Sequence, residues 1–401
     1  MVGLFRLAPI AVALYMAVIA PSQAQENSIK IGVLTDMSSL YADLAGPGAV
    51  AATKMAVADF GGRVLGKRIE VISADHQNKP DVATEIARQW FDQGVDMITD
   101  LTTSSVALAV QEVAREKNKV ILINGAASSD LTGKNCAATS VHWTYDTTAL
   151  ANGTGSAVVK AGGKSWFFIT ADYAFGHALE RDTAAVVKEN GGTVLGHALV
   201  PLNTADFSSY LVQARASNAQ VIGLANAGGD TINSIKQAAE FGIVTGGQKL
   251  AGLLIFLTDI HSLGLQTAQG LQLTSAFYWD LNDQTRAWSK RFYAVMHKQP
   301  TMVQAGDYSA TLGWLEAVKA ANSLDAAAVM KQLRSHPIND FMTSNGHIQP
   351  DGSLVRDMYL FEVKKPSEST GEWDLYKLVR TIPGAIAFKR PVSNACPLVK
   401  G

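Results

Sequence analysis

Three segments of the chain place small and hydroxyl-bearing residues where a predicted strand gives way to a predicted helix. They are residues 37–41, 101–105 and 124–130. The first turn of a helix has N–H groups without partners and a partial positive charge, and small side chains let an anion approach that backbone. With Thr103 and Ser104 as further hydroxyl donors, the natural guest is a carboxylate. The simpler alternative is that these hydroxyl groups only cap their own helices.

Later segments offer a wall and polar groups for the same kind of site. Tyr173 and Phe175 are candidates for an aromatic wall over an apolar ligand; the alternative is that one of them packs against the next helix. Asn226, Asp230 and Asp259 follow predicted strands and supply an amide and two carboxylates. Both acids could instead cap helices.

Signatures of catalysis are missing from the sequence. It has no G-x-S-x-G, no H-E-x-x-H, no C-x-x-C, and no G-x-G-x-x-G that opens a helix after a strand. Residues 163–165 resemble the end of a phosphate-binding loop, but Val158 stands where that loop needs glycine and the group precedes a strand. Nothing supports pairing Asp172, Asp230 or Asp259 as acid and base. We expect a binding protein that is not an enzyme, with no cofactor and no metal.

The chain contains two cysteines, Cys136 and Cys396. In an oxidising compartment such a pair tends to form a disulfide, which here would tie the tail to the middle of the chain. The alternative is two buried free thiols. A catalytic thiol is not expected, because neither cysteine has a nearby histidine in the sequence to activate it.

The first residues have the pattern of a secretory signal. Arg6 supplies a positive charge, residues 7–20 are apolar, and small residues precede a cut after about Ala24. An uncleaved membrane anchor is the alternative, but the apolar run is shorter than the roughly 20 residues needed to span a bilayer. No cysteine follows the cut, so a lipoprotein is not expected. We therefore predict export to the periplasm.

Composition narrows the class of protein further. The 34 Lys and Arg residues nearly balance the 35 Asp and Glu residues, and no basic block suggests nucleic acid as a partner. A length of 401 residues with 47% hydrophobic residues suits two domains with separate cores.

The positioning elements form two arrays of alternating strands and helices. Short apolar runs between helices predict parallel sheets covered on both faces. The first array has strands at 29–34, 68–73, 95–99 and 120–124, and helices at 46–60, 81–91 and 104–116. The second has strands at 165–170, 193–200, 220–225, 250–256 and 270–277, and helices at 175–190, 207–217, 230–241, 284–297 and 309–323.

The arrays are separated by a break near residues 143–146, and residues 358–363 and 373–379 read as closing antiparallel strands around a turn at 366–371. We expect two α/β lobes joined by short crossings, which is a hinge arrangement. Ligands of open α/β sheets lie beyond the carboxyl ends of the strands, so facing lobes would form a binding cleft.

At these junctions the chain resembles the leucine/isoleucine/valine-binding protein family, the type I periplasmic binding proteins of branched-chain amino acid importers. The resemblance covers essentially the whole chain after the signal. It is carried by residues 29–33, 46–48, 102–105, 125–128, 172–176, 346–348 and 351–352.

The resemblance implies two Rossmann-like lobes with parallel central sheets, joined by three crossings. The expected domains are a signal peptide (1–24), lobe 1 (25–144 plus about 277–350), lobe 2 (145–276 plus about 351–390) and a C-terminal tail (391–401). By resemblance, Thr103, Ala126, Ala127 and Ser128 hold the ligand carboxylate. The full set of predicted ligand-binding residues is Tyr41, Thr103, Ser104, Ala126, Ala127, Ser128, Tyr173, Phe175, Asn226 and Asp259.

The resemblance also implies the function, which is capture of a small organic carboxylate for an ABC importer and delivery to its membrane permease. In members that bind amino acids an acidic residue holds the ammonium group, and here Asp230 or Asp259 is the candidate. Residues 253–259 and 277–280 look more like members that take aromatic or other non-amino acids. We expect a monomer; the alternative function is a ligand-binding sensor of the same fold.

Overall fold

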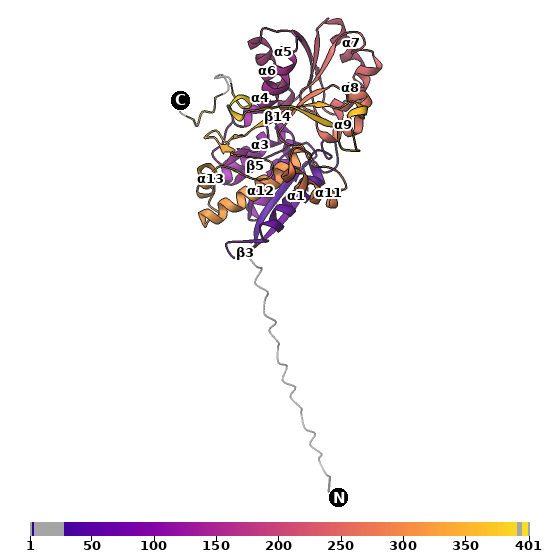
Figure 1. Ribbon diagram of the computed structural model, residues 1–401. Helices are drawn as coiled ribbons and strands as arrows, with labels where there is room; N and C mark the ends of the chain where they lie inside the picture. Colours follow the sequence, from indigo (N-terminus) through magenta and orange to yellow (C-terminus); the bar gives the residue numbers. More distant parts are fainter. Residues whose placement is uncertain (1, 4–27, 391–394, 400–401) are drawn as a thin grey trace.

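The computed structural model describes residues 2–3, 28–390 and 395–399, and most of the chain is arranged around two parallel β-sheets (Figure 1). We call each sheet with its covering helices a unit; the first unit is the lower one in Figure 1 and the second unit the upper one. The predicted signal peptide lies outside the described residues, apart from residues 2–3. Within the described ranges, no helix combines the length and the apolar character that crossing a membrane requires.

The first unit contains a six-stranded sheet in the order β2-β3-β1-β4-β5-β6. Neighbouring strands are parallel except β2 and β3, which are antiparallel. Central strand β1 is buried along nearly its whole length, as expected for a strand covered on both faces. The strands are β1 (Ile29–Thr35), β2 (Arg63–Val64), β3 (Lys67–Asp75), β4 (Val95–Asp100), β5 (Val120–Ile123) and β6 (Ser140–His142).

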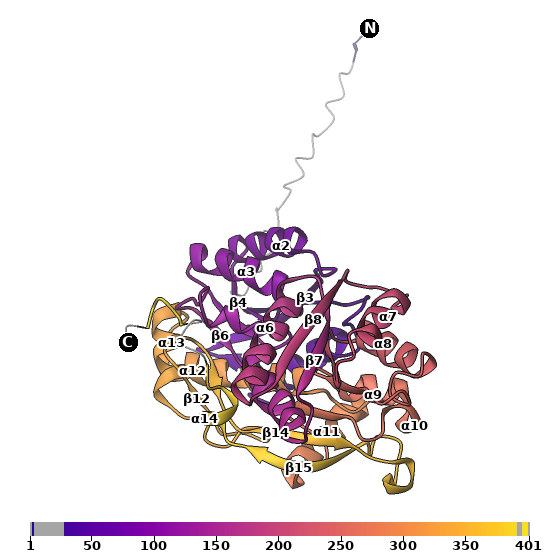
Figure 2. The same ribbon diagram turned by 90° about the horizontal axis from the view of Figure 1, so that it is seen from above.

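Helices cover both faces of this sheet, with α2 and α3 on one side and α12 on the other (Figure 2). Because side chains alternate along a strand, Ile31 and Met97 share a buried cluster with Trp314 of α12. Leu34 and Ile98 face the opposite way, into the cluster beneath α2 and α3. The helices of the first unit are α1 (Gly46–Asp59), α2 (Pro80–Asp92), α3 (Ser104–Lys117), α11 (Asp283–Met296), α12 (Met302–Ala321) and α13 (Ala326–Ser335).

The second unit contains a four-stranded, fully parallel sheet in the order β10-β9-β7-β8. Its strands are β7 (Ser165–Ala171), β8 (Thr193–Val200), β9 (Val221–Ala225) and β10 (Lys249–Gly252). Its helices are α4 (Thr147–Leu150), a π-helix (Ala151–Gly155), α5 (Ser156–Lys160), α6 (Ala174–Glu189), α7 (Ser208–Ala216), α8 (Gly229–Glu240), α9 (Leu257–Leu263) and α10 (Leu265–Ala268).

An antiparallel sheet in the order β11-β14-β15 lies beside the second unit, and strands β12 and β13 form a separate pair. The chain therefore passes between the two units three times: after β6, after β11 and after β13. This agrees with the predicted class of two α/β units joined by three crossings. The elements are β11 (Gln272–Ser275), β12 (His347–Ile348), β13 (Leu354–Val355), β14 (Met358–Val363), a short 3-10 helix (Pro366–Glu368), β15 (Tyr376–Ile382) and α14 (Gly384–Ala387).

Several predicted bounds were wrong for identifiable reasons. The strand predicted at 250–256 ends at Gly252, because the apolar residues after it turn towards the interior between the units. Helix α12 begins seven residues before its predicted start. A capping box begins it: Thr301 Oγ1 accepts from the N–H of Gln304 at 3.4 Å, and the Thr301 N–H donates to Gln304 Oε1 at 3.0 Å.

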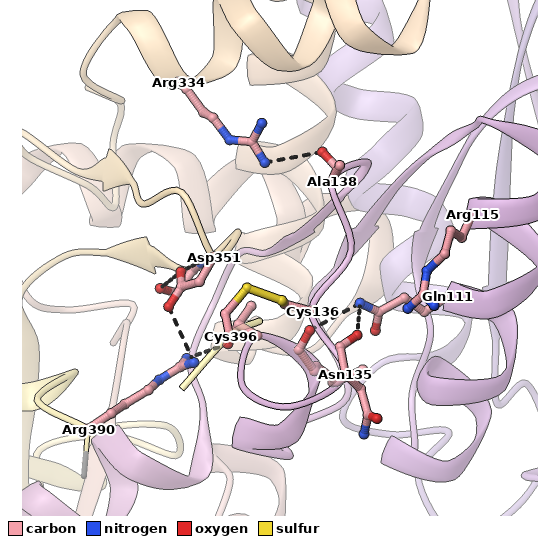
Figure 3. The surroundings of a disulfide bond; sticks show 12 residues. Gln111, Arg115, Asn135, Cys136, Ala138, Arg334, Asp351, Arg390 and Cys396 are labelled. Carbon is pink, nitrogen blue, oxygen red and sulfur yellow. Dashed lines mark hydrogen bonds and ion pairs between the residues drawn. A yellow bond between two sulfur atoms is a disulfide. The ribbon is translucent and has the colours of Figure 1, made fainter. Parts of the chain in front are cut away.

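Cys136 and Cys396 form a disulfide, as predicted, and it joins the C-terminal tail to the loop before β6 (Figure 3). Just before the tail, Arg390 donates to Asp146 at 2.7 Å, contacts Asp351 at 3.4 Å and donates to Thr132. Asp146 lies in the crossing after β6, and Asp351 lies in the turn between β12 and β13. Ion pairs thus hold the segment before the tail to the first crossing and to the β12–β13 turn, and a covalent bond joins the tail itself to the first unit.

Candidate functional site

A small cavity lies between the two units, at the carboxyl ends of both parallel sheets. The space between its lining residues is about 260 Å³ in all, including the part that is open to solvent. The loops after β1, β4 and β5 line it from the first unit, and those after β7, β9 and β10 line it from the second. The lining residues are Tyr41, Leu44, Thr102, Thr103, Ser104, Gly125, Ala126, Ala127, Tyr145, Tyr173, Phe175, Ala227, Leu254 and Phe256.

Helix α3 begins at the floor of this cavity. Its N-cap residue, Thr103, makes no side-chain cap hydrogen bond, so the first N–H groups of α3 are not satisfied by a cap. Thr103 is 5% exposed, and within the described part of the chain its hydroxyl oxygen has no hydrogen-bond partner. A ligand oxygen at this place would accept hydrogen bonds from the first N–H groups of α3 and from the Thr103 hydroxyl.

The side chain of Ser104 holds the second floor loop beside the start of α3. Its Oγ accepts from the N–H of Ala127 at 3.3 Å and from the N–H of Ser128 at 3.0 Å. The Ser128 side chain is itself used locally, since its Oγ accepts from the N–H of Asp130 at 3.3 Å. Ser104 is therefore both a lining residue and the link between the two floor loops.

The backbone under the floor is strained. Asp100, Leu101 and Thr103 have φ values of 77°, 55° and 67°, a region that residues other than glycine rarely adopt. Such conformations cost on the order of 1–3 kcal/mol each and persist at ligand clamps where the surroundings enforce them. Here Thr102 Oγ1 donates to Asp100 Oδ2 at 2.7 Å and lies 3.3 Å from Thr35 Oγ1.

Aromatic rings from both units wall the cavity. The hydroxyl groups of Tyr41, from the first unit, and Tyr173, from the second, are 2.8 Å apart in a hydrogen bond. Tyr173 packs against Phe175 with ring centroids 5.8 Å apart, and Tyr145 meets Phe256 edge-on at 6.3 Å. Burial raises the pKa of all three tyrosines, so the wall is uncharged at neutral pH.

Two helices of the second unit also begin at the cavity. Tyr173 is the N-cap residue of α6 and Gly228, next to the lining residue Ala227, is that of α8; neither makes a side-chain cap hydrogen bond. Together with α3, three helix N-termini with partial positive charge surround a lining that contains no charged side chain among the described residues. This arrangement favours a small anion with an apolar body.

Asp259 and Asp230, the two candidates for holding an ammonium group, are not among the lining residues. The carboxylate of Asp259 accepts from the N–H of Phe256 at 2.9 Å and so caps α9. Asp230 accepts from the N–H groups of Asn203 and Thr204 at 3.1 and 3.0 Å. Burial raises the pKa of Asp259 to about 7 and that of Asp230 to about 6. Both act on nearby backbone in this structure.

The structure brings seven of the ten predicted site residues to the cavity and leaves Ser128, Asn226 and Asp259 outside its lining. Asn226 is engaged within its own loop, where its side-chain oxygen accepts from Thr231 Oγ1 at 2.7 Å. Sequence reasoning missed Tyr145, which lies in the first crossing, where no strand or helix pattern marks it. In the described ranges, no group of three or more His, Cys, Asp or Glu side chains is placed to hold a metal ion.

Comparison with known proteins agrees with the predicted family and fold. A family model described as periplasmic binding protein matches residues 28–371. A periplasmic binding protein from Burkholderia mallei is 55% identical, with a TM-score of 0.92 over 93% of this chain and 100% of that one.

More distant relatives are described in more detail. A branched chain amino acid ABC transporter periplasmic ligand-binding protein from Burkholderia xenovorans LB400 is 42% identical, with a TM-score of 0.82 over 92% of this chain and 100% of that one. Leu/Ile/Val-binding protein homolog 6 of Brucella melitensis is 23% identical over 88% of this chain and 92% of its own length. The resemblance read from the sequence is confirmed. Since the family model spans most of the chain, including every loop that lines the cavity, the chain belongs to the periplasmic binding protein family.

Proposed function

We propose that this chain is the substrate-binding protein of an ABC importer and that its cavity takes a small aromatic carboxylate. The observation that carries the proposal is the uncharged, ring-lined cavity onto which three helix N-termini open. The family and its relatives support the transport role, and the lining residues support the ligand class.

The carboxylate is assigned to the floor formed by Thr103, Ser104 and Ala126. There the start of α3 and the unpartnered hydroxyl of Thr103 supply donors. Hydrogen bonds to a charged acceptor contribute about 1.5–3 kcal/mol each when the site is dry. The helix dipole adds a smaller favourable amount.

The aromatic body is assigned to the space between Tyr41, Tyr145, Tyr173, Phe175 and Phe256. Rings in contact with a flat ligand bury apolar area and gain favourable edge and stacking contacts. An ammonium group would enter a cavity whose lining holds no carboxylate among the described residues. An unpaired buried charge is costly, which favours a ligand without an amine.

A branched-chain amino acid is the second candidate, favoured by the description of the B. xenovorans relative. Its ammonium group would have to be held by neutral oxygens, and the hydroxyl groups of Tyr41, Tyr145 and Tyr173 are the available ones.

A thermal-shift panel on the mature protein tests the ligand class. We expect benzoate and 4-hydroxybenzoate to stabilise the protein, by about 2.7 kcal/mol at a hundredfold the Kd. Benzamide is the matched control, because it keeps the ring but lacks the charge, and it should shift the melting temperature much less. Stabilisation by leucine, isoleucine or valine without any effect of the benzoates would exclude the aromatic ligand and favour the second candidate.

The remaining assignments belong to the same proposal. We place the mature chain in the periplasm as a monomer that delivers its ligand to a membrane permease, after cleavage near Ala24. The lobes would be residues 25–144 plus about 277–350 and residues 145–276 plus about 351–390. None of the relatives reported above is described as a sensor. Mass spectrometry of the exported protein would establish the cleavage site.

A further inference from the structure

The N–H group of Ala126 is buried at the cavity floor. Ala126 is 2% exposed, and within the described residues its N–H donates to no hydrogen-bond acceptor. Buried backbone N–H groups almost always have a partner. Because Ala126 lines the cavity, a bound ligand can supply the acceptor that this group lacks.

The peptide group that contains this N–H is held at its other end. It joins Gly125 to Ala126, and the hydroxyl group of Tyr145 donates to the Gly125 carbonyl oxygen at 2.9 Å. No cis peptide bond occurs in the described part of the chain, and in a trans peptide the C=O and the N–H point in opposite directions. Tyr145 therefore fixes the direction of the Ala126 N–H from the opposite side of the peptide group.

The peptide group that follows, between Ala126 and Ala127, is bonded at both ends. His142 Nε2 lies 2.7 Å from the Ala126 carbonyl oxygen, and the Ala127 N–H donates to Ser104 Oγ at 3.3 Å. Because a carbonyl oxygen can only accept, Nε2 must carry the proton. Nδ1 of His142 is buried without a partner in the described ranges, and burial lowers the pKa of His142, so the ring is neutral at neutral pH.

A third peptide group, between Ala127 and Ser128, repeats this arrangement. The Ala127 carbonyl oxygen accepts from the Thr147 N–H at 2.8 Å, and the Ser128 N–H donates to Ser104 Oγ at 3.0 Å. The donors to the three successive carbonyl groups thus all come from residues 142–147, which include the first crossing. Of these three peptide groups, the first alone has an end without a partner among the described residues, and that end is the Ala126 N–H.

We propose that Tyr145 and His142 are positioning residues for the ligand carboxylate: they fix the two peptide groups on either side of Ala126, so that its N–H donates to the ligand. This inference rests on the proposed function and gives both residues a role that the binding scheme above does not use. Without their hydrogen bonds the peptide groups would be free to turn. A turned peptide group would present a carbonyl oxygen, which only accepts and would repel the anion.

NMR of the mature protein labelled with 15N-alanine tests the direction of the Ala126 N–H. Addition of 4-hydroxybenzoate should move the Ala126 amide proton downfield, because hydrogen bonds to a charged acceptor are short and strong. The absence of the signal in Ala126→Gly assigns it.

Two variants remove the two positioning hydrogen bonds. Tyr145→Phe keeps the ring of the cavity wall and loses only the hydroxyl group, and His142→Leu loses the Nε2 donor. In each, the downfield shift should shrink and the affinity for 4-hydroxybenzoate should fall on the order of tenfold, because a hydrogen bond to a charged acceptor is weakened. A full shift with unchanged affinity in Tyr145→Phe would overturn the proposal, even if His142→Leu does not fold.

Thr144→Val is the matched control. Thr144 is buried in the same crossing, and its hydroxyl group donates to the side chain of Asn124 at 2.9 Å instead of to a floor carbonyl group. This variant should lower the melting temperature but keep the Ala126 shift and the affinity. His142→Gln restores an N–H donor and should recover part of both. If Thr144→Val weakened binding as much as Tyr145→Phe, a general loosening of the crossing would explain the losses and the proposal would fail.

A measurement without ligand separates this inference from the proposed function. In protein labelled with 15N-histidine, at about pH 7.5 and so above the ordinary histidine pKa, His142 should carry its proton on Nε2 and none on Nδ1. The loss of its signals in His142→Gln identifies them. A proton on Nδ1 alone would overturn the role of His142. Failure of every benzoate to bind would contradict the proposed ligand alone, since the carboxylate of leucine should then produce the Ala126 shift. A carboxylate that binds without this shift would contradict the inference in either case.

Discussion

In the binding mode proposed above, the hydroxyl group of Thr103 donates directly to the ligand carboxylate. It is buried at the start of α3, on a residue with φ of 67°, and has no partner within the described residues. A polar atom buried in this way normally has a partner. We attribute this unpaired hydroxyl group to the binding site itself.

Thr103→Val replaces the hydroxyl group with a methyl group of similar size. The affinity for a carboxylate ligand should fall about 10- to 100-fold, the equivalent of one hydrogen bond to a charged acceptor. The free energy of unfolding without ligand should not fall, because no protein contact is lost. Thr103→Ser is the control and should retain most of the affinity. Calorimetric titration with benzoate measures both variants.

Gly228 permits the contact between the two units beside the cavity. It has φ of 58°, and a Cβ atom there would lie 2.9 Å from the carbonyl oxygen of Leu40 and 3.0 Å from the ring of Tyr41. Leu40 and Tyr41 belong to the first unit and Gly228 to the second, so a side chain at this position would hold the units apart.

We therefore expect Gly228→Ala to weaken ligand binding at least tenfold, since about 1.4 kcal/mol of lost contact already gives that factor. Gly264→Ala is a matched control: Gly264 also has a positive φ, of 76°, but has nothing within 4 Å of the added methyl group. It should lower the melting temperature without a comparable change in affinity. Equal affinities for the two variants would show that the Tyr41 contact does not govern closure.

At the scale of residues, the sequence correctly predicted that Thr103, Ser104 and Ala126 line the cavity, but not that Asp259 lies outside its lining. Thr103, Ser104 and Ala126 follow strands whose ends meet at one sheet edge, so local pattern was sufficient to place them. Asp259 also follows a strand, but its carboxylate caps α9, a helix that the predicted strand at 250–256 concealed. Whether an acid faces a cavity or its own backbone depends on a turn of a few residues, which composition does not reveal.

Among the elements, α9 contains Asp259, a buried acid that makes the free energy of unfolding depend on pH. Burial raises the pKa of Asp259 to about 7, while the unfolded chain keeps the ordinary value of 3.8. Between these values the folded protein binds more protons than the unfolded chain, so the free energy of unfolding falls as the pH rises.

The measurement is unfolding at about pH 5.5 and pH 7.5, above the ordinary aspartate pKa. The wild type should be more stable at the lower pH. Asp259→Asn keeps an acceptor for the Phe256 N–H and should flatten this dependence by on the order of 1–3 kcal/mol, because a tenfold change in proton affinity between the folded and unfolded chain is worth about 1.4 kcal/mol. A slope equal to that of the wild type would mean that Asp259 is ionised in the folded protein.

The bounds of helices and strands were predicted correctly where a long apolar periodicity marks them. They were wrong or missed where a capping residue sets the start of a helix. Strand β14 has the predicted bounds, and α2, α3, α6, α7 and α8 agree within one residue at each end. Helix α13 was not predicted at all, because its short, alanine-rich sequence after Asp325 gives a weak pattern, although Asp325 caps it by accepting from the N–H of Ala328 at 2.9 Å. The three-strand antiparallel sheet depends on pairing between β11 and β14, which are far apart in sequence.

On the scale of the whole molecule, the disulfide closes a loop of the chain with a sequence separation of 260 residues. Cross-linking residues so far apart restricts the unfolded chain strongly. Just before the tail, the ion pairs of Arg390 add contacts with Asp146 in the first crossing and with Asp351 in the β12–β13 turn.

Cys136→Ser combined with Cys396→Ser should lower the free energy of unfolding by up to about 5 kcal/mol, the chain-entropy value for a long loop. Denaturant unfolding of the double variant measures the loss. Reduced wild-type protein is the control and should match it. A double variant as stable as the oxidised protein would mean that the tail is held mainly by the contacts of Arg390.

The three helix N-termini at the cavity have a further consequence for the ligand-free protein. While the units are apart, water can occupy those N–H groups; bringing the units together without an anion would strip that water and leave the donors unsatisfied. The two units are thus expected to close only when an anion occupies the cavity. A transporter that responds only to the closed form would then not hydrolyse ATP without a ligand to transport. The ligand-free protein would stay open and hydrated.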